Sequence, residues 1–334
     1  MEKLRAGIIG LSMGAGHLDA YASHPEVEVR GVCDLNKDLL GQLARKYNVE
    51  FATADYRELL GRKDIDMVSV ATPDYFHAEQ SIAALEAGKH VLCEKPMTVT
   101  LEDCREIVRA AERSGRKFMV GQICRFAPGF RLTKRLIDEG KIGELFFVES
   151  EYAHDYSGVP GAGGWRKDPV KKREPFLGGG CHAVDLVRWI AGDAEEVFAY
   201  ANHRILADWP VDDCTIAAFK FKNGILGKVL VSIGCKRPYT MRSVFWGSRG
   251  TIISDNTSPA IKIYQDGMEK LEFVDMAVDI ASHNVRAEVD EIVDCIRGRK
   301  QLLMDAREGA RTVASCLAAV ESAKSGKAEK VRAF

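Results

Sequence analysis

Apolar segments alternate with amphipathic ones through the first third of the chain, and this alternation limits the possible folds most strongly. Each apolar segment predicts a strand, and a segment that predicts a helix follows it. The expected strands are 4–10, 27–33, 66–71, 90–93 and 117–121, and the expected helices are 17–23, 38–47, 76–87 and 101–114. Strands and helices at this spacing form a parallel sheet with helices on both faces. The sequence therefore predicts a doubly wound α/β domain of the Rossmann type over residues 1–122.

The first predicted strand ends in a turn of small residues that leads into a helix. Backbone N–H groups at a helix start, together with the helix dipole, suit a pyrophosphate. The dinucleotide fingerprint GxGxxG/A is matched with a serine in the place of the second glycine and an alanine at the end. The residues predicted to hold the cofactor here are Gly10, Ser12, Met13, Gly14 and Ala15.

Asp34 ends the second predicted strand, where the fingerprint places the acid that binds a ribose. A carboxylate there accepts hydrogen bonds from the 2′-hydroxyl of NAD and repels the 2′-phosphate of NADP. NAD is therefore the predicted cofactor, with NADP the less favoured one.

Two further strands end in residues suited to ligand binding. Thr72, Pro73 and His77 follow the third strand and are predicted to line the cofactor groove, because ligands bind at the carboxyl edge of such sheets. The alternative is a turn in which Asp74 caps the next helix. The fourth strand delivers Glu94 and Lys95 to the same edge and stops at a proline. A solvated charge pair that closes the strand is the alternative there.

Bulk composition excludes several classes of partner and site. Lysine plus arginine (47) nearly balance aspartate plus glutamate (48), so no overall field attracts nucleic acid or an anionic membrane. There is no signal-like N-terminus and no apolar run of membrane-spanning length, so a cytoplasmic protein is expected. Nine cysteines occur singly, without a CxxC pair. They are interpreted as reduced core residues, and no metal site is predicted.

The order of four motifs resembles the Gfo/Idh/MocA family, the group of glucose-fructose oxidoreductase and inositol dehydrogenase. The motifs are the glycine turn with Asp34, the run Thr72 to His77, the run Glu94 to Pro96, and the run Gly178 to Asp185. This resemblance implies a second, α+β domain over residues 123–334 with a large, mostly antiparallel open sheet. Such a sheet often forms a subunit interface, so a homo-oligomer, either a dimer or a tetramer, is expected.

Strands and helices that fit such a second domain follow residue 122. The strands are predicted at 145–152, 195–204, 214–221, 226–233, 242–246, 251–254 and 260–264, and the helices at 128–139, 182–191, 285–297 and 306–324. A further short strand is possible at 330–334.

The resemblance also implies the catalytic residues. Hydride transfer from an alcohol needs a base for the hydroxyl proton and a donor for the developing alkoxide. In the family the histidine near the glycine-rich turn is usually the base, which here is His182, and the lysine of the Glu-Lys-Pro motif, here Lys95, bonds the reacting oxygen or the ribose. One departure is Gly178, where the family usually has an aspartate.

Six residues are predicted to contact the substrate. Asp185 lies one helical turn after His182, and His154 and Asp155 end a strand, with Asp155 either a replacement carboxylate or a turn residue. Trp165 and Arg166 lie in the segment 157–177, whose basic run continues to Arg173. This loop either covers the substrate or clamps a neighbouring subunit. Arg125 is the sixth, with a helix-capping role as its alternative.

These residues predict an NAD(P)-dependent dehydrogenase that acts on the CH–OH group of a sugar, sugar derivative or cyclitol, or reduces the matching ketone. Two other classes stay open at this point. One is a lyase or glycosidase that uses tightly bound NAD transiently, and the other is a non-catalytic regulatory protein that responds to NAD. The substrate itself and the direction of the reaction do not follow from the sequence.

Overall fold

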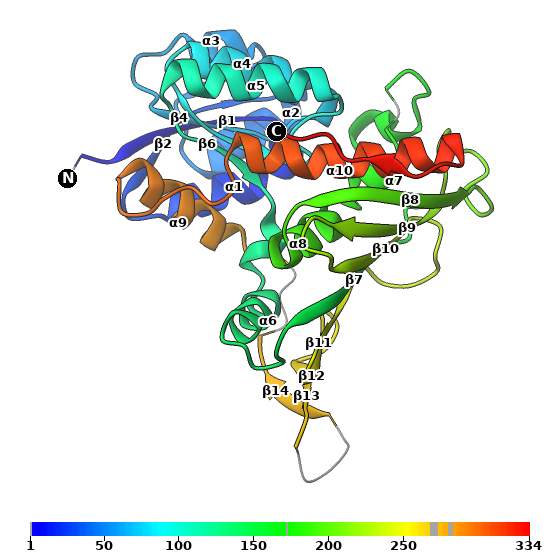
Figure 1. The fold of residues 1–334 in the computed structure, drawn as a ribbon. Coiled ribbons are helices and arrows are strands. Elements are labelled where there is room, and N and C mark those ends of the chain that lie inside the picture. Colours follow the sequence, from blue (N-terminus) through cyan, green and yellow to red (C-terminus); the bar gives the residue numbers. More distant parts are fainter. Residues whose placement is uncertain (1, 172, 268–272, 280–282) are drawn as a thin grey trace. The chain divides into compact units, whose positions relative to one another are not determined.

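The computed structural model describes residues 2–171, 173–267, 273–279 and 283–334 (Figure 1). The chain divides into two compact units. The first unit comprises Met1–Gln122 and Val285–Val313, and the second comprises Ile123–Asn284 and Ala314–Phe334. A segment near the C-terminus thus completes the unit that the first third of the chain begins.

A six-stranded parallel sheet forms the centre of the first unit, as predicted. Its order is β3-β2-β1-β4-β5-β6, so the chain reverses its direction of travel across the sheet between β1 and β4. The strands are β1 (Leu4–Ile9), β2 (Val27–Cys33), β3 (Phe51–Thr53), β4 (Met67–Val70), β5 (His90–Glu94) and β6 (Phe118–Gly121). The residues of β4 are buried throughout, which is typical of a sheet covered on both faces.

Helices cover both faces of this sheet. Figure 1 shows α3, α4 and α5 on one side and α1 and α9 on the other. The helices are α1 (Leu11–Ser23), α2 (Lys37–Lys46), α3 (Tyr56–Leu60), α4 (His77–Glu86), α5 (Leu101–Ser114) and α9 (Val285–Ile296), with a 3₁₀ turn, η1 (Asp74–Phe76), before α4. The hydroxyl of Thr100 accepts the N–H of Asp103 at the start of α5, and Gly115 ends it with φ 62°.

The structure differs from the predicted first unit in two places. Helix α1 begins at Leu11, so the small residues after Gly10 are helical and the turn is shorter than expected. Strand β3 and helix α3 were not predicted, because elements of three and five residues carry too little periodicity to be recognised.

The second unit contains a nine-stranded sheet that is antiparallel except where β7 pairs with β10, which confirms the predicted sheet. Its order is β14-β13-β12-β11-β7-β10-β9-β8-β15. The strands are β7 (Leu145–Ala153), β8 (Ala194–Asn202), β9 (Cys214–Phe221), β10 (Leu226–Ser232), β11 (Thr240–Gly247), β12 (Gly250–Asp255), β13 (Ala260–Gln265), β14 (Val274–Ala277) and β15 (Glu329–Lys330).

Helices of the second unit pack on one face of this sheet, and among the described residues no helix packs on the other, which we call the bare face. They are α6 (Pro128–Asp138), α7 (Pro175–Gly178), α8 (Cys181–Ala191) and the later part of α10 (Ala306–Ser325), with 3₁₀ turns η2 (Ile123–Phe126) and η3 (Ala162–Lys167). Helix α8 lies against β7 and β10, and α6 lies against β12 and β13. The described helices include none that is both long and apolar enough to cross a membrane.

Candidate active site

The residues predicted to bind the cofactor gather at the carboxyl edge of the six-stranded sheet. Gly10 follows β1, Thr72 follows β4, and Lys95 follows β5. Because β1 and β4 are neighbours in the sheet, this edge contains the switch point at which such folds bind nucleotides.

Two glycines let the chain turn tightly at this edge. Gly10 has φ 88°, and a Cβ there would lie 2.7 Å from the carbonyl oxygen of Ala71. A Cβ on Gly14 would lie 2.8 Å from a methyl of Ile8, so Gly14 allows the close contact of α1 with the sheet. Ser12 and Met13 are exposed in the first turn of α1, where a bound pyrophosphate would meet the helix N-terminus.

Asp34 is half-buried beside this turn and is already oriented by the backbone. One carboxylate oxygen accepts the N–H of Leu11 at 2.6 Å, and the other accepts the N–H of Asn36 at 2.7 Å. These bonds fix the carboxylate at the end of β2, with lone pairs left for the hydroxyls of a ribose.

His77 is buried and joins two loops of the cofactor edge. Its Nδ1 lies 2.8 Å from the carbonyl oxygen of Pro96, and its Nε2 lies 2.8 Å from that of Thr72. Burial lowers the pKa of His77, although the two carbonyls oppose this shift. Both ring nitrogens are engaged, so His77 holds the loops in place rather than offering a nitrogen to a ligand. The hydroxyl of Thr72 bonds to Gln80 at 2.7 Å.

A buried cluster of His17, Glu94 and Glu288 lies beneath Lys95, and we call it the His17 cluster. His17 Nε2 lies 3.2 Å from Glu94 Oε1 and 3.9 Å from Glu288 Oε2, while its Nδ1 bonds to Ser69 at 2.9 Å. The second oxygen of Glu94 accepts the backbone N–H of Lys95 at 3.1 Å. Glu288 comes from α9, far along the chain, and no sequence motif indicated it.

The charges of this cluster shift the pKa of all three groups. Burial raises the pKa of Glu288 to about 8, and the charge of Glu94 adds to this shift. Burial opposes the ionisation of Glu94 too, but the hydrogen bond and charge of His17 and the charge of Lys95 lower its pKa to about 2. Burial disfavours protonated His17, yet the two carboxylates raise its pKa. These opposite shifts favour an ionised Glu94 and a protonated Glu288 on either side of His17.

In the second unit, His182 is buried near the start of α8 among aromatic rings. The ring of Tyr152 is stacked on it with centroids 6.4 Å apart and planes at 25°. The hydroxyl of Tyr152 bonds to that of Tyr156 at 2.8 Å and lies 3.4 Å from Nδ1 of His154. Burial and the charge of Arg166 lower the pKa of His154, which favours a neutral imidazole there.

Arg125 and Asp185 were predicted to contact the substrate, and the structure pairs them with each other. Arg125 Nε and Nη2 each donate to the carboxylate of Asp185 at 2.7 Å. Both side chains are buried, with 7% and 2% of their surface exposed. This bidentate pair fixes α8 to the segment after β6, and it leaves little of either charge for a ligand.

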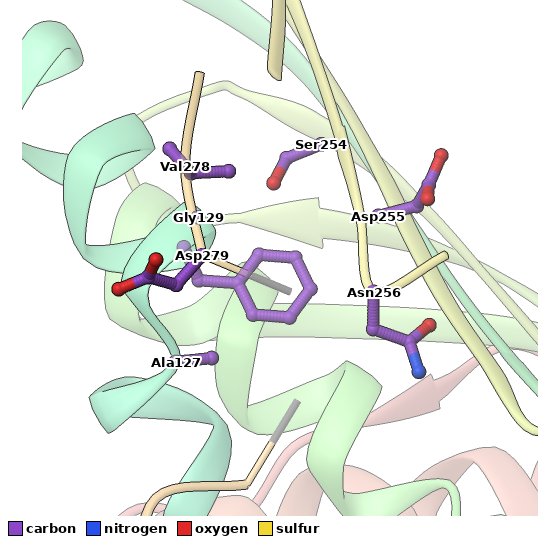
Figure 2. Close-up of a pocket in the computed structure, with 8 residues that line it drawn as sticks. Ala127, Gly129, Ser254, Asp255, Asn256, Val278 and Asp279 are labelled. Atoms are coloured by element: carbon purple, nitrogen blue, oxygen red, sulfur yellow. The ribbon is translucent and has the colours of Figure 1, made fainter. Parts of the chain in front are cut away.

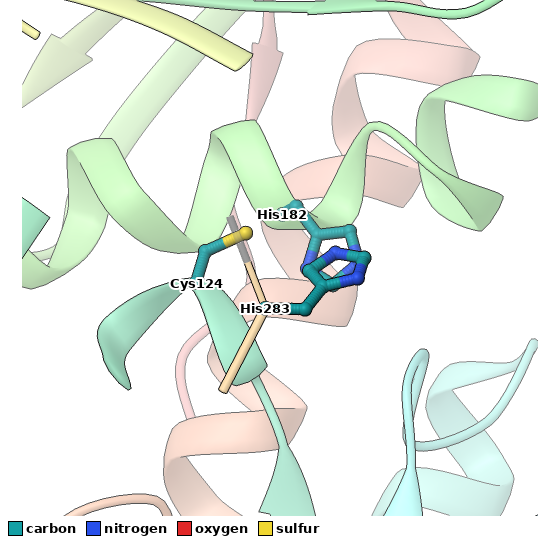
Figure 3. Close-up of side chains that lie close together, drawn as sticks. All are labelled: Cys124, His182 and His283. Atoms are coloured by element: carbon teal, nitrogen blue, oxygen red, sulfur yellow. The ribbon is translucent and has the colours of Figure 1, made fainter. Parts of the chain in front are cut away.

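Figure 3 shows Cys124, His182 and His283 close together, and their ligand atoms all lie within 4.8 Å of one another. A thiol and two imidazoles form a donor set that Zn²⁺ accepts in proteins. The sequence predicted no metal site, because the three residues are widely separated along the chain.

Comparisons with known proteins identify the family. Residues 4–122 match the profile described as oxidoreductase family, NAD-binding Rossmann fold, and residues 130–253 match the Gfo/Idh/MocA C-terminal domain. Levoglucosan dehydrogenase of Pseudarthrobacter phenanthrenivorans is 31% identical in an alignment of 267 positions that covers 69% of this chain and 67% of that protein. The chain belongs to the Gfo/Idh/MocA family of oxidoreductases.

Other members of the Gfo/Idh/MocA family agree with this assignment. Inositol 2-dehydrogenase of Salmonella typhimurium is 29% identical over 74% of this chain and 72% of that protein. A solved structure of levoglucosan dehydrogenase in complex with NADH superposes with a TM-score of 0.91 over 100% of both chains at 24% identity, which shows the shared fold. An oxidoreductase domain protein from Kribbella flavida is 28% identical, with a TM-score of 0.91 over 99% of this chain and 100% of that one.

The carboxylate of Asp155 is bonded to a turn residue and to a lysine. It accepts a hydrogen bond from the N–H of Ser157 at 3.0 Å and forms an ion pair with Lys236 at 3.1 Å. The bonds from Ser157 and Lys236 lower its pKa to about 2. This geometry favours the turn alternative over a replacement carboxylate.

Beside Gly178, a guanidinium occupies the place of a side chain. A Cβ built on Gly178 would lie 1.2 Å from Nη1 of Arg173. Arg173, Arg166 and Trp165 line one pocket together with Tyr156, Pro175, Trp209, Val211 and Ile233. The segment 157–177 is therefore not an uninterrupted loop, because it contains η3 and the start of α7. Residues of both elements line this pocket.

A second pocket lies between α6 and β12 (Figure 2). It is lined by Ala127, Gly129, Phe130, Ser254, Asp255, Asn256, Val278 and Asp279. The amide of Asn256 accepts the N–H of Met241 at 2.7 Å and donates to the carbonyl of Tyr239 at 3.2 Å, so it serves the fold. None of the predicted site residues lines this pocket.

Proposed function

We propose that this oxidoreductase is an NAD-dependent dehydrogenase that exchanges a hydride with the CH–OH carbon of a sugar, sugar derivative or cyclitol. The observation that carries the proposal is the position of Lys95. This residue directly follows β5 at the nucleotide edge of the sheet, and its backbone N–H is bonded to Glu94. NAD, when bound, accepts the hydride from the alcohol carbon.

In this proposal two chemical tasks fall to His182 and Lys95. His182 takes the hydroxyl proton, and Lys95 donates a hydrogen bond to the oxygen as its charge develops. Glu94 fixes the backbone that carries Lys95, because its carboxylate accepts the backbone N–H of that residue. Names of relatives support this reaction, since they include levoglucosan dehydrogenase and inositol 2-dehydrogenase.

NAD is proposed over NADP because Asp34 presents an ionisable carboxylate where the ribose would lie. One structural relative is described as a putative NADPH-dependent oxidoreductase, so cofactor choice varies within similar folds.

The test is turnover of NAD with a panel of polyols and cyclitols, followed by absorbance of NADH. Lys95→Ala should lower kcat by about 10²- to 10⁴-fold while NADH still binds, because the loss concerns the transition state. Lys63→Ala, an exposed lysine of the same unit, is the control and should retain full activity. Wild-type turnover by Lys95→Ala would refute the mechanism. NADH released in proportion to product excludes a lyase or glycosidase that regenerates NAD in each cycle.

We also propose that the bare face of the nine-stranded sheet joins subunits. Tyr200, Ile216, Leu226 and Trp246 are exposed on it, with 41–68% of their surface accessible, and the strand register places them on the same face. Large exposed apolar side chains on one face are typical of interaction surfaces. Sedimentation should show a dimer or tetramer for the wild type, and Trp246→Glu with Ile216→Glu should yield monomers.

A further inference from the structure

The backbone at Gly178 leaves room that a guanidinium fills. Besides the contact with Nη1, a Cβ on Gly178 would lie 2.3 Å from Cζ of Arg173, so no side chain fits there unless Arg173 moves. The resemblance to the family places an aspartate at this position. In this chain a guanidinium therefore lies where the family pattern has a carboxylate.

The pocket around Arg173 is rich in hydrogen-bond donors. Its lining, within the part of the chain that the structure describes, contains two arginines and no aspartate or glutamate. Arg166 Nε and Trp209 Nε1 are buried, and neither has a hydrogen-bond partner among the described residues. A buried donor without an acceptor is unfavourable, so these groups favour a ligand that brings acceptor atoms.

Aromatic rings complete this pocket. The guanidiniums of Arg166 and Arg173 each lie 5.1 Å from the ring of Trp165, and Arg166 lies 5.6 Å from the ring of Tyr156. Asp208, the carboxylate next to Trp209, is paired with Lys167 at 2.5 Å. The rings thus hold the two guanidiniums in place, and planar guanidiniums suit a carboxylate.

Within the second unit, Tyr152 connects the pocket lining to the proposed base. Tyr156 lines the pocket and bonds to Tyr152, whose ring is stacked on His182. Gly178 ends α7, and His182 is the second residue of α8, which follows after a two-residue turn. We infer that this pocket binds the carboxylate of an acidic sugar, such as a uronic or aldonic acid. The inference rests on the proposed function and deepens it by naming the substrate class.

Binding of matched acids and neutral sugars tests this inference without turnover. Calorimetry in the presence of NADH would compare D-glucuronate and D-galacturonate with D-glucose and D-galactose. We expect the acids to bind about tenfold more tightly or better, because each charge-assisted hydrogen bond contributes about 1.5–3 kcal/mol. Glucose 6-phosphate is the third arm, and a preference for it over both other groups would overturn the carboxylate assignment.

Variants of the two arginines locate the effect. Arg166→Gln and Arg173→Gln should each weaken binding of the acids about tenfold and change binding of neutral sugars less than twofold. If Arg173→Gln is unstable, Arg166→Lys is the second variant. Arg166 is partly exposed, so this variant should fold, and a lysine there keeps the positive charge but cannot form two parallel hydrogen bonds with a carboxylate. Arg135→Gln, on the exposed face of α6, is the control. Equal affinity for acids and neutral sugars, or acid binding unchanged by Arg166→Gln, would overturn the inference.

Failure of the inference and failure of the proposed function give different results. NADH formation with neutral sugars and no preference for acids would refute the carboxylate pocket and leave the dehydrogenase proposal intact. Tight, arginine-dependent binding of acids without NADH formation would uphold the pocket and refute the dehydrogenase.

Discussion

Both units bury carboxylates, and two of these, Asp185 and Glu288, are compensated in opposite ways. In the second unit Asp185 accepts two hydrogen bonds of 2.7 Å from Arg125. In the first unit both oxygens of Glu288 are buried without a hydrogen-bond partner among the described residues, and its nearest cation is His17 at 3.9 Å. Equal burial thus produces a fixed ion pair in one unit and a group poised to hold a proton in the other.

The presence or absence of a guanidinium partner gives the two carboxylates different roles. A buried carboxylate with a bidentate partner stays ionised and fixes the elements that carry the pair. A buried carboxylate beside a second carboxylate avoids ionisation instead, because two negative charges in an apolar site repel each other. The Asp185 pair therefore supports α8 and His182, whereas Glu288 adjusts the charge beneath Lys95.

The largest expected effect comes from breaking the compensated pair. Arg125→Ala should lower the free energy of unfolding by about 3–5 kcal/mol at pH 7, because Asp185 is left buried and unpaired. Chemical denaturation monitored by fluorescence measures this change. Arg135→Ala, at an exposed arginine of the same unit, should cost less than about 0.5 kcal/mol. The double variant Arg125→Met/Asp185→Leu should recover most of the loss, and a double variant no more stable than Arg125→Ala would argue against the ion pair as the cause.

Glu288→Gln tests the uncompensated carboxylate through pH. The folded state keeps a proton on Glu288 that the unfolded chain loses above pH 4.5, since its pKa rises from 4.5 to about 8 on folding. The wild type should therefore lose stability relative to Glu288→Gln as pH rises from about 4.5 toward 8, by roughly 3 kcal/mol at pH 7.

Denaturation curves at several pH values measure this difference. The charged groups that face Glu288 are His17 on α1 and Glu94 and Lys95 at the end of β5, and they remain in the variant. Asp290→Asn on the exposed side of α9 is the control. Parallel pH profiles for the wild type and Glu288→Gln would show that Glu288 is ionised in both states.

The sequence predicted the parts of the molecule whose evidence is local. Helix α5 was predicted at its observed bounds, because its amphipathic period is bounded by Thr100 and Gly115. The start of α1 was wrong, because small residues after Gly10 resemble a loop although only Gly10 needs its positive φ. Glu288 and the contact of Arg173 with Gly178 were missed, because each depends on residues brought together by folding. Arg173 was visible only as one member of a basic run.

Asp34 is intermediate between Asp185, which has a guanidinium partner, and Glu288, which has no hydrogen-bond partner among the described residues. Its substitution should have the smallest effect of the three. It is half-buried, and its two hydrogen bonds come from backbone N–H groups rather than a cation. Asp34→Ser should weaken NADH binding about tenfold and narrow the preference over NADPH, because the ribose loses a charged acceptor and a 2′-phosphate loses a repelling charge. Nicotinamide fluorescence measures both dissociation constants. Asp38→Ser, exposed in the first turn of α2, is the matched control and should change neither. If NADH affinity were equal in wild type and Asp34→Ser, the carboxylate would serve only to hold the turn between β1 and α1.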